Sequence, residues 1–126
     1  GWYWDRDKAS REWTERYLDN GGTTPTSPHA ALYSATMAYL KAVEAAGTDE
    51  SDAVREAMGN KPIDDFFAQG GTIRDDGLLE HDMYLLKAKQ PSESEGTWDL
   101  ATIERTIPGD RAYASLAESG CQRVAE

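Results

Sequence analysis

Residues 71–98 read GTIRDDGLLEHDMYLLKAKQPSESEGTW, and this stretch decides how the rest of the chain is interpreted. It contains an Asp75-Asp76-Gly77 turn, in which the glycine supplies the positive φ of a tight reversal. Beyond the turn, two sets of residues alternate with the period of a strand: Leu79, His81, Met83 and Leu85, and Glu80, Asp82, Tyr84 and Leu86. The pattern predicts a β-hairpin over about residues 71–89, followed by an exposed Pro/Ser/Glu connection.

Three helices are expected upstream of the hairpin. Asp5 or Asp7 can cap the first helix, which runs to about Asn20 and is stopped by two glycines. Its apolar stripe consists of Ala9, Trp13 and Tyr17. A short third helix, begun by acidic residues, covers about residues 49–58.

The second helix should start near Ser27, with Pro28 at the first helical position, where its missing N–H costs nothing. Gly47 should end it. The helix carries a broad face of mostly small residues: Ala31, Ala35, Ala38, Tyr39, Ala42, Val43 and Ala46. Such a face permits close packing against a sheet or another helix.

The remaining elements are expected to be short. Three apolar residues after Pro62 are predicted core anchors: Ile63, Phe66 and Phe67. A strand should run over about residues 98–107 and end at Pro108-Gly109. Asp110 is then expected to cap a last helix through Ala117.

Composition restricts the class of protein. The chain has 126 residues, enough for one domain, and its 39% hydrophobic and 29% charged residues indicate a globular chain. The net charge of −10 argues against nucleic acid and anionic membranes, because both need clustered Lys and Arg. No apolar run approaches the ~20 residues that span a bilayer, and no signal peptide is present.

Candidate chemistry is sparse. In a strand, Glu80, His81 and Asp82 point to alternate faces, which disfavours a shared metal ion. The acidic residues near Asp49 lack the glycine and final glutamate of a calcium loop, so a helix start explains them better. There is no phosphate loop, zinc spacing or Ser/His/Asp order. We therefore expect no catalytic residues, metal or cofactor, and no enzyme.

Several segments in order resemble one known family: WYWDRD, LYSATMAYLKAVEAAGTDESDAV, PIDDFF, IRDDG, DMYL, KQPSESEGTWD and TIPGDRAYASLAESGC. The chain resembles the type I periplasmic solute-binding proteins of ABC importers, in the class that carries branched-chain amino acids and small aromatic acids. The resemblance implies an α/β fold with two lobes, of which this chain is the C-terminal third, a helix-rich fragment with a β-hairpin and few strands. Residues 1–82 would belong mostly to one lobe, and residues 83–126 would cross over and return to the other.

The resemblance also implies a function. The intact protein would capture a small carboxylate solute in the periplasm or outside the cell, free or as a lipoprotein, and deliver it to a membrane permease. Binding would close the lobes by a hinge motion, with no bond made or broken. The fragment alone would bind the solute weakly or not at all.

Two groups of residues are candidates for the ligand site. The resemblance places Tyr3 and Trp4 near the hinge and the cleft, although at least two of the three aromatics Trp2–Trp4 could instead be core. It also places Ser27, Pro28 and His29 where relatives bring a side chain to the ligand. A helix N-terminus favours a carboxylate, and His29 could donate a hydrogen bond, stack on an aromatic ligand or be merely solvated. Many relatives carry an apolar or amide residue here, which leaves two alternatives open: a different ligand, or no contact between His29 and the ligand.

Other readings remain open. Cys121 is the single cysteine, either a small semi-buried residue or the partner of a cysteine upstream.

A lobe fragment would expose apolar surface, which favours a homodimer that exchanges the hairpin or a helix. The rival functions are a helical protein-interaction module, a sensor domain of the same fold, and a small hydrolase using His81 or His29.

Overall fold

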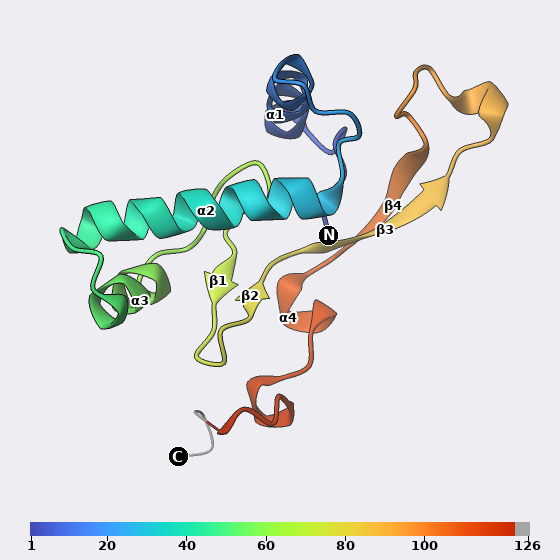
Figure 1. The fold of residues 1–126 in the computed structure, drawn as a ribbon. Helices are drawn as coiled ribbons and strands as arrows, with labels where there is room; N and C mark the ends of the chain where they lie inside the picture. The colour runs from blue at the N-terminus through green and yellow to red at the C-terminus, as the bar shows by residue number, and fades with distance from the viewer. Residues whose placement is uncertain (123–126) are drawn as a thin grey trace.

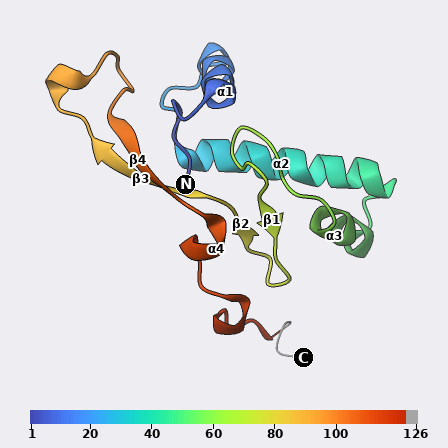
Figure 2. The ribbon, with the colours of Figure 1, turned by 180° about the vertical axis from the view of Figure 1, so that it is seen from behind.

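The computed structural model describes residues 1–122 of the chain. Its elements are α1 (Lys8–Asp19), α2 (Ser27–Ala46), α3 (Ser51–Gly59), β1 (Thr72–Ile73), β2 (Leu79–Glu80), β3 (Met83–Ala88), β4 (Ala101–Ile107) and α4 (Gly109–Ala112), with single 3₁₀ turns at Pro91–Glu93 and Leu116–Glu118. The long helix α2 lies in the middle, with α1 near its N-terminal end and α3 near its C-terminal end (Figures 1 and 2). The β3–β4 ribbon reaches away from the helices (Figure 1). None of the helices in this part of the chain is long and apolar enough to cross a membrane.

The helix ends follow local rules. The Asp7 carboxylate caps α1 by accepting from the Ser10 N–H at 2.8 Å, and Glu50 caps α3 in the same way. Gly47 ends α2 with a positive φ of 67°, which a residue with a side chain rarely adopts. These ends confirm the predicted extents of the three helices to within two residues, although Pro28 is the second helical residue and Ser27 the first.

The inward face of α1 differs from the predicted stripe at one position. Ser10, Trp13 and Thr14 are buried and Tyr17 is partly buried, whereas Ala9 is exposed. The Ser10 hydroxyl donates to the Phe66 carbonyl at 3.2 Å, and this contact turns the Ser10 side of the helix inward. The expectation for Ala9 was wrong because a hydrogen bond, rather than hydrophobicity, selects the inward side.

Helix α2 buries small side chains and exposes large ones. Its buried residues are Ala30, Ser34 and Ala42. Ser34 donates to the Asp65 carboxylate at 2.6 Å, which fixes α2 against the turn that follows Ile63. The predicted face of small residues is confirmed at Ala42, but Ala35 is exposed because the inward side follows the Ala30–Ser34 line.

The core is a cluster of aromatic rings. It comprises Trp2, Trp13, Ala30, Phe66, Phe67 and Ala68, with Ile63 among the partly buried residues packed against it. The Trp13 ring stacks on Phe66 with centroids 4.7 Å apart, and the Trp2 ring meets Trp13 edge-on at 5.4 Å. The three predicted anchors after Pro62 therefore contribute to the core, in a turn rather than a helix.

The predicted hairpin is confirmed at its turn and wrong in its second strand. β1 pairs antiparallel with β2, and Gly77 has the positive φ (85°) that the reversal requires. The strand ends at Glu80, and after His81 and Asp82 the chain continues as β3, which pairs with β4 instead. The Asp82 carboxylate accepts from the Gly109 N–H at 3.0 Å, so a distant partner takes this residue out of the strand.

The β3–β4 ribbon closes a long connection over residues 89–100. An ion pair between Lys89 and Asp99, at 2.6 Å, fastens the base of that connection. Hydrogen bonding to Lys89 holds the pKa of Asp99 below its ordinary value, and the same contact raises the pKa of Lys89. β4 begins at Ala101, three residues later than the predicted strand start.

The chain after β4 departs from the predicted last helix. Pro108 is the residue before α4, and Asp110 lies inside that helix rather than capping it. The helix ends at Ala112 rather than at Ala117, and a 3₁₀ turn at Leu116–Glu118 follows it. Pro108 sets this start because its fixed backbone suits the position just before a helix turn.

Candidate ligand-binding surface

Tyr3 and Trp4 lie side by side, half-buried, against the connection between β3 and β4. Their ring centroids are 6.1 Å apart. Trp4 donates from Nε1 to the Trp98 carbonyl at 2.7 Å, and the Tyr3 hydroxyl donates to the same carbonyl at 3.3 Å. The Tyr3 hydroxyl also accepts from the Ala101 N–H at 3.2 Å. Because these polar groups are already engaged, the accessible part of both side chains is mainly ring surface.

Ser27, Pro28 and His29 form the first turn of α2. Ser27 is partly buried, whereas Pro28 and His29 are exposed. Thr26 occupies the N-cap position, yet its side chain does not cap the helix. The first-turn N–H groups therefore have no side-chain acceptor, which leaves the positive end of the helix dipole available to an anion.

The Thr26 hydroxyl contacts His29 instead. Its Oγ1 lies 2.8 Å from His29 Nδ1, and the Tyr17 hydroxyl lies 3.3 Å from the same nitrogen. Nδ1 has a single lone pair, so it accepts from one of these hydroxyls in the tautomer that carries the ring proton on Nε2. His29 Nε2 can then donate to a carboxylate placed at the start of α2.

The His29 ring continues a column of aromatic rings. It lies 5.2 Å from the Tyr17 ring, which stacks on Trp13 at 5.3 Å with the planes only 13° apart. Trp13 in turn stacks on Phe66. The exposed end of this column is the His29 ring, which lies in the first turn of α2.

The structure keeps the two groups of predicted residues apart. Within residues 1–122, neither a hydrogen bond nor a ring contact joins Tyr3 or Trp4 to the first turn of α2. Trp4 packs against the core cluster from outside, and so does Tyr17, whose hydroxyl contacts His29. Sequence reasoning missed Tyr17 as a partner of His29, and Trp98 as the partner of Tyr3 and Trp4. A lone tryptophan in the polar PSESEGTW segment was the available signal for Trp98.

The sequence disfavoured a metal ion shared by Glu80, His81 and Asp82, and in the structure these three residues contact different partners. Glu80 lies 3.5 Å from Arg74, while Asp82 accepts from Gly109. The His81 ring lies between Phe67, at 5.0 Å, and Tyr113, at 6.0 Å. In the part of the chain that the structure describes, no three His, Cys, Asp or Glu side chains converge as metal ligands would.

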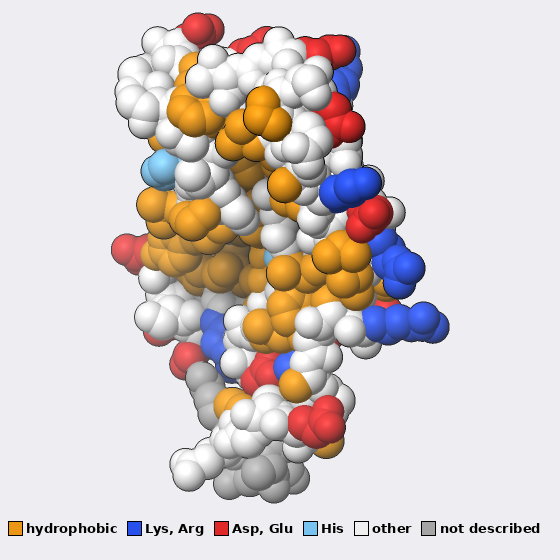
Figure 3. All heavy atoms as spheres, turned by 90° about the vertical axis from the view of Figure 1, so that its right-hand side faces the viewer, with side chains coloured by type: hydrophobic (Ala, Val, Ile, Leu, Met, Phe, Trp, Pro, Cys, Tyr) orange, Lys and Arg blue, Asp and Glu red, His pale blue; other side chains and the backbone are white. Residues whose placement is uncertain are grey.

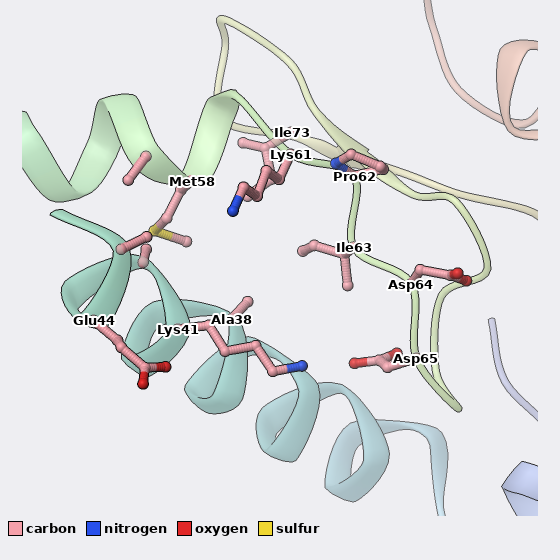
Figure 4. Close-up of a pocket in the computed structure, with 13 residues that line it drawn as sticks. Ala38, Lys41, Glu44, Met58, Lys61, Pro62, Ile63, Asp64, Asp65 and Ile73 are labelled. Carbon is pink, nitrogen blue, oxygen red and sulfur yellow. The ribbon is translucent and has the colours of Figure 1, made fainter.

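A hollow of about 590 Å³ lies between α2, α3 and residues 61–65 (Figure 4). Its lining includes Met58 and Ile63, and the Lys41 side chain extends along α2 toward Asp65. None of the five predicted ligand residues lines this hollow. It is therefore separate from the surface formed by the aromatic column and the start of α2.

Comparison with known proteins agrees with the resemblance seen in the sequence. Residues 1–96 match the sequence profile of the periplasmic binding protein family, whereas no curated protein sequence matches the chain. A periplasmic binding protein from Burkholderia mallei is 46% identical with a TM-score of 0.92, over 98% of this chain and 32% of that one. A branched chain amino acid ABC transporter periplasmic ligand-binding protein from Burkholderia xenovorans LB400 is 36% identical with a TM-score of 0.92, over 97% of this chain and 33% of that one. The chain therefore spans about a third of the length of each relative.

Proposed function

This chain belongs to the periplasmic binding protein family, and from that premise we propose that the intact protein is the solute-binding component of an ABC importer. It captures a branched-chain amino acid or a small aromatic acid outside the cytoplasmic membrane and delivers it to a permease. The observation that carries this proposal is the TM-score of 0.92, over 98% of the chain, with a periplasmic binding protein that is 46% identical. The protein works in the periplasm or outside the cell, with or without a lipid anchor.

The proposed mechanism is binding followed by closure of two lobes, with no bond made or broken. Residues 1–82 belong mostly to one lobe, and residues 83–126 cross over and return to the other. The exposed side chains support a larger intact protein, because Leu32 on α2 is 70% exposed and Leu85 on β3 is 47% exposed. Large apolar side chains at these positions fit surfaces that the remaining two-thirds of the protein covers.

In the proposed site, this chain forms one wall of the cleft. The solute carboxylate lies at the N-terminus of α2, near Ser27 and Pro28, and accepts a hydrogen bond from His29 Nε2. The apolar part of the solute lies against ring surface supplied by Tyr3, Trp4 and the aromatic column. Donors from the rest of the protein complete the site, so the 126-residue chain alone binds weakly or not at all.

The exposed face of α2 also fits a second function, a helical module that binds another protein. That reading predicts cooperative unfolding of the 126-residue chain alone and no upstream coding sequence in frame. The length of the two solved relatives favours the transport receptor.

Titration calorimetry of the protein expressed from its complete reading frame tests the proposed function. The ligands are leucine, isoleucine, valine, benzoate and phenylacetate. We expect saturable binding of at least one acid, and a loss of about tenfold to a hundredfold in affinity on His29→Ala, the usual cost of a hydrogen bond to a charged group. The matched control is Lys41→Ala, an exposed residue of the same helix outside the proposed site.

Two results would count against parts of this proposal. Binding of no acid by the complete protein would remove the transport function. Equal affinities for the His29→Ala and Lys41→Ala variants would leave the function in place and remove the start of α2 from the site.

A further inference from the structure

One buried guanidinium joins three segments that are distant in sequence. The Arg6 side chain is only 6% exposed. Its Nη2 donates to the Phe66 carbonyl at 2.7 Å, and its Nη1 donates to the Phe67 carbonyl at 3.0 Å and to the Tyr84 hydroxyl at 3.3 Å. Arg6 therefore links the N-terminal segment to the turn after Ile63 and to β3.

The hydrogen bonds from Arg6 to the turn after Ile63 are short, and further hydrogen bonds hold the same groups in place. The Phe66 carbonyl also accepts from Trp2 Nε1 at 3.1 Å and from the Ser10 hydroxyl at 3.2 Å. Arg6 Nε pairs with Asp7 at 2.7 Å, and Asp7 caps α1. Burial alone would raise the pKa of Asp7, but hydrogen bonds from Ser10 and Arg6 outweigh it and lower the pKa. The guanidinium is thus held firmly to α1 and to the core.

The contact with β3 is longer and can change more easily. The Arg6–Tyr84 hydrogen bond is the longest of the four that the Arg6 side chain makes within residues 1–122, and the guanidinium carbon lies 5.5 Å from the centre of the Tyr84 ring. A cation over an aromatic ring tolerates changes in angle better than a hydrogen bond does. Tyr84 is the second residue of β3, at the point where the ribbon leaves the helices.

We propose that Arg6 is a positioning residue for lobe closure, which fastens β3 and the N-terminal segment to the helical lobe and sets the angle from which the lobes close. This inference rests on the proposed function, in which β3 belongs to the segment that crosses to the other lobe and the N-terminal segment lies near the hinge. Arg6 reaches the solute in neither state. It acts by limiting how far the ligand-free protein opens, and hence what fraction is ready to bind.

An arginine suits this position better than a lysine does. Its planar guanidinium presents several donors in a fixed fork, and here the fork reaches two successive carbonyls and a hydroxyl. A lysine ammonium is a single point and cannot span the same three acceptors. Arg6→Lys keeps the charge and removes the fork, and Tyr84→Phe removes only the hydroxyl.

The test uses the complete protein in four forms: wild type, Tyr84→Phe, Arg6→Lys and the control Arg11→Lys. Arg11 is an exposed arginine of α1 that pairs with Asp5 at 3.0 Å, so the control makes the same change of side chain away from β3. Three quantities are measured: the melting temperature, the dissociation constant of the solute, and the radius of gyration by small-angle X-ray scattering without and with saturating solute.

We expect Tyr84→Phe to weaken binding about threefold to tenfold, the size expected for one hydrogen bond. Its ligand-free radius of gyration should increase while the saturated value stays at that of the wild type. Arg6→Lys should shift both quantities further in the same direction, and Arg11→Lys should shift neither. If Arg6→Lys does not fold, the affinity and the ligand-free radius of gyration of Tyr84→Phe alone decide whether the inference holds.

Lowered melting temperatures with unchanged affinity and unchanged radii would overturn the inference and leave Arg6 a structural residue. An unchanged Tyr84→Phe variant would overturn it as well. If the wild-type protein binds no acid, the proposed function fails separately, and the ligand-free radii still show whether the Arg6–Tyr84 contact limits opening.

Discussion

An ordinary surface helix turns large apolar side chains inward and polar side chains outward. Helix α2 instead turns small side chains inward and leaves large apolar side chains exposed. The inner face, Ala30, Ser34 and Ala42, is at most 5% exposed, whereas the outer face, Leu32, Tyr39 and Leu40, is between 45% and 70% exposed. At 3.6 residues per turn these sets fall on opposite sides of the helix. A helix that is apolar all round is typical of the interior of a larger protein. The difference indicates that this chain supplies cover for only one side of α2.

The same contrast separates the aromatic core from the β3–β4 ribbon. The core encloses Trp13 to 4% exposure, while Leu85 and Leu86, neighbours on β3, are both more than 40% exposed. Figure 3 shows hydrophobic side chains gathered across the middle of one face of the molecule. Part of this chain is thus a closed core, and part is surface suited to further contacts.

The largest effect is expected inside the closed core. Trp13→Ala removes a ring that stacks on both Phe66 and Tyr17, and should lower the free energy of unfolding by about 3–5 kcal/mol. Urea denaturation of the complete protein measures this loss. A loss below about 1 kcal/mol is what ordinary surface substitutions cause. Such a small loss would contradict the distinction between a closed core and an uncovered outer face.

A smaller effect, dependent on chain length, is expected on the outer face. Leu40→Ala should cost about 2–3 kcal/mol in the complete protein, where the residue is covered, and under about 0.5 kcal/mol in the 126-residue chain alone. Urea denaturation of both lengths gives the two values. Equal small costs would mean that nothing in the complete protein covers this face.

The uncovered face should also cause the short chain to associate. We expect the 126-residue chain alone to elute as a dimer, and Leu32→Glu with Leu40→Glu to return it to a monomer. A compact monomer without these substitutions would contradict this expectation.

The smallest effect concerns the ribbon, through the pair Lys89–Asp99. The folded pKa of Asp99 is lowered, so its stabilisation is complete above the ordinary value of about 4 and is lost as the pH falls through the folded value. The pKa of Lys89 is raised, so its stabilisation is complete below about pH 10 and is lost as the pH rises further.

The difference in unfolding free energy between wild type and Asp99→Asn should therefore be constant between about pH 5 and 9 and shrink in acid. Asp64→Asn, at an exposed carboxylate without an ion pair in the described residues, is the control. A difference that does not change down to pH 2 would show that the pair adds nothing to the stability of the ribbon.

Local features of the fold were predictable from sequence, and distant contacts were not. The Asp7 cap, the Gly47 end of α2 and the Gly77 turn depend on neighbouring residues. Both glycines were predicted correctly, and Asp7 was one of the two predicted caps, with Asp5 as the alternative. The break in the long strand depends on Asp82 and Gly109, which are 27 residues apart. Alternation alone cannot reveal such a contact.

The candidate site shows the same division. The helix start at Ser27 was predicted from Pro28 and the preceding polar loop. The hydrogen bond from Trp4 to the Trp98 carbonyl joins residues 94 positions apart. It was not predictable from the sequence around either residue. That the five candidate residues contact solute remains a prediction.

Thermal unfolding of two proteins, the complete chain and the 126-residue chain, each with the panel of branched-chain and aromatic acids, tests the central claim most directly. A ligand that binds only the folded state raises the melting temperature by mass action. We predict a rise for the complete protein with at least one acid, and none for the short chain. An equal rise in both, or none in either, would contradict the claim that this chain is one part of a two-lobe solute receptor.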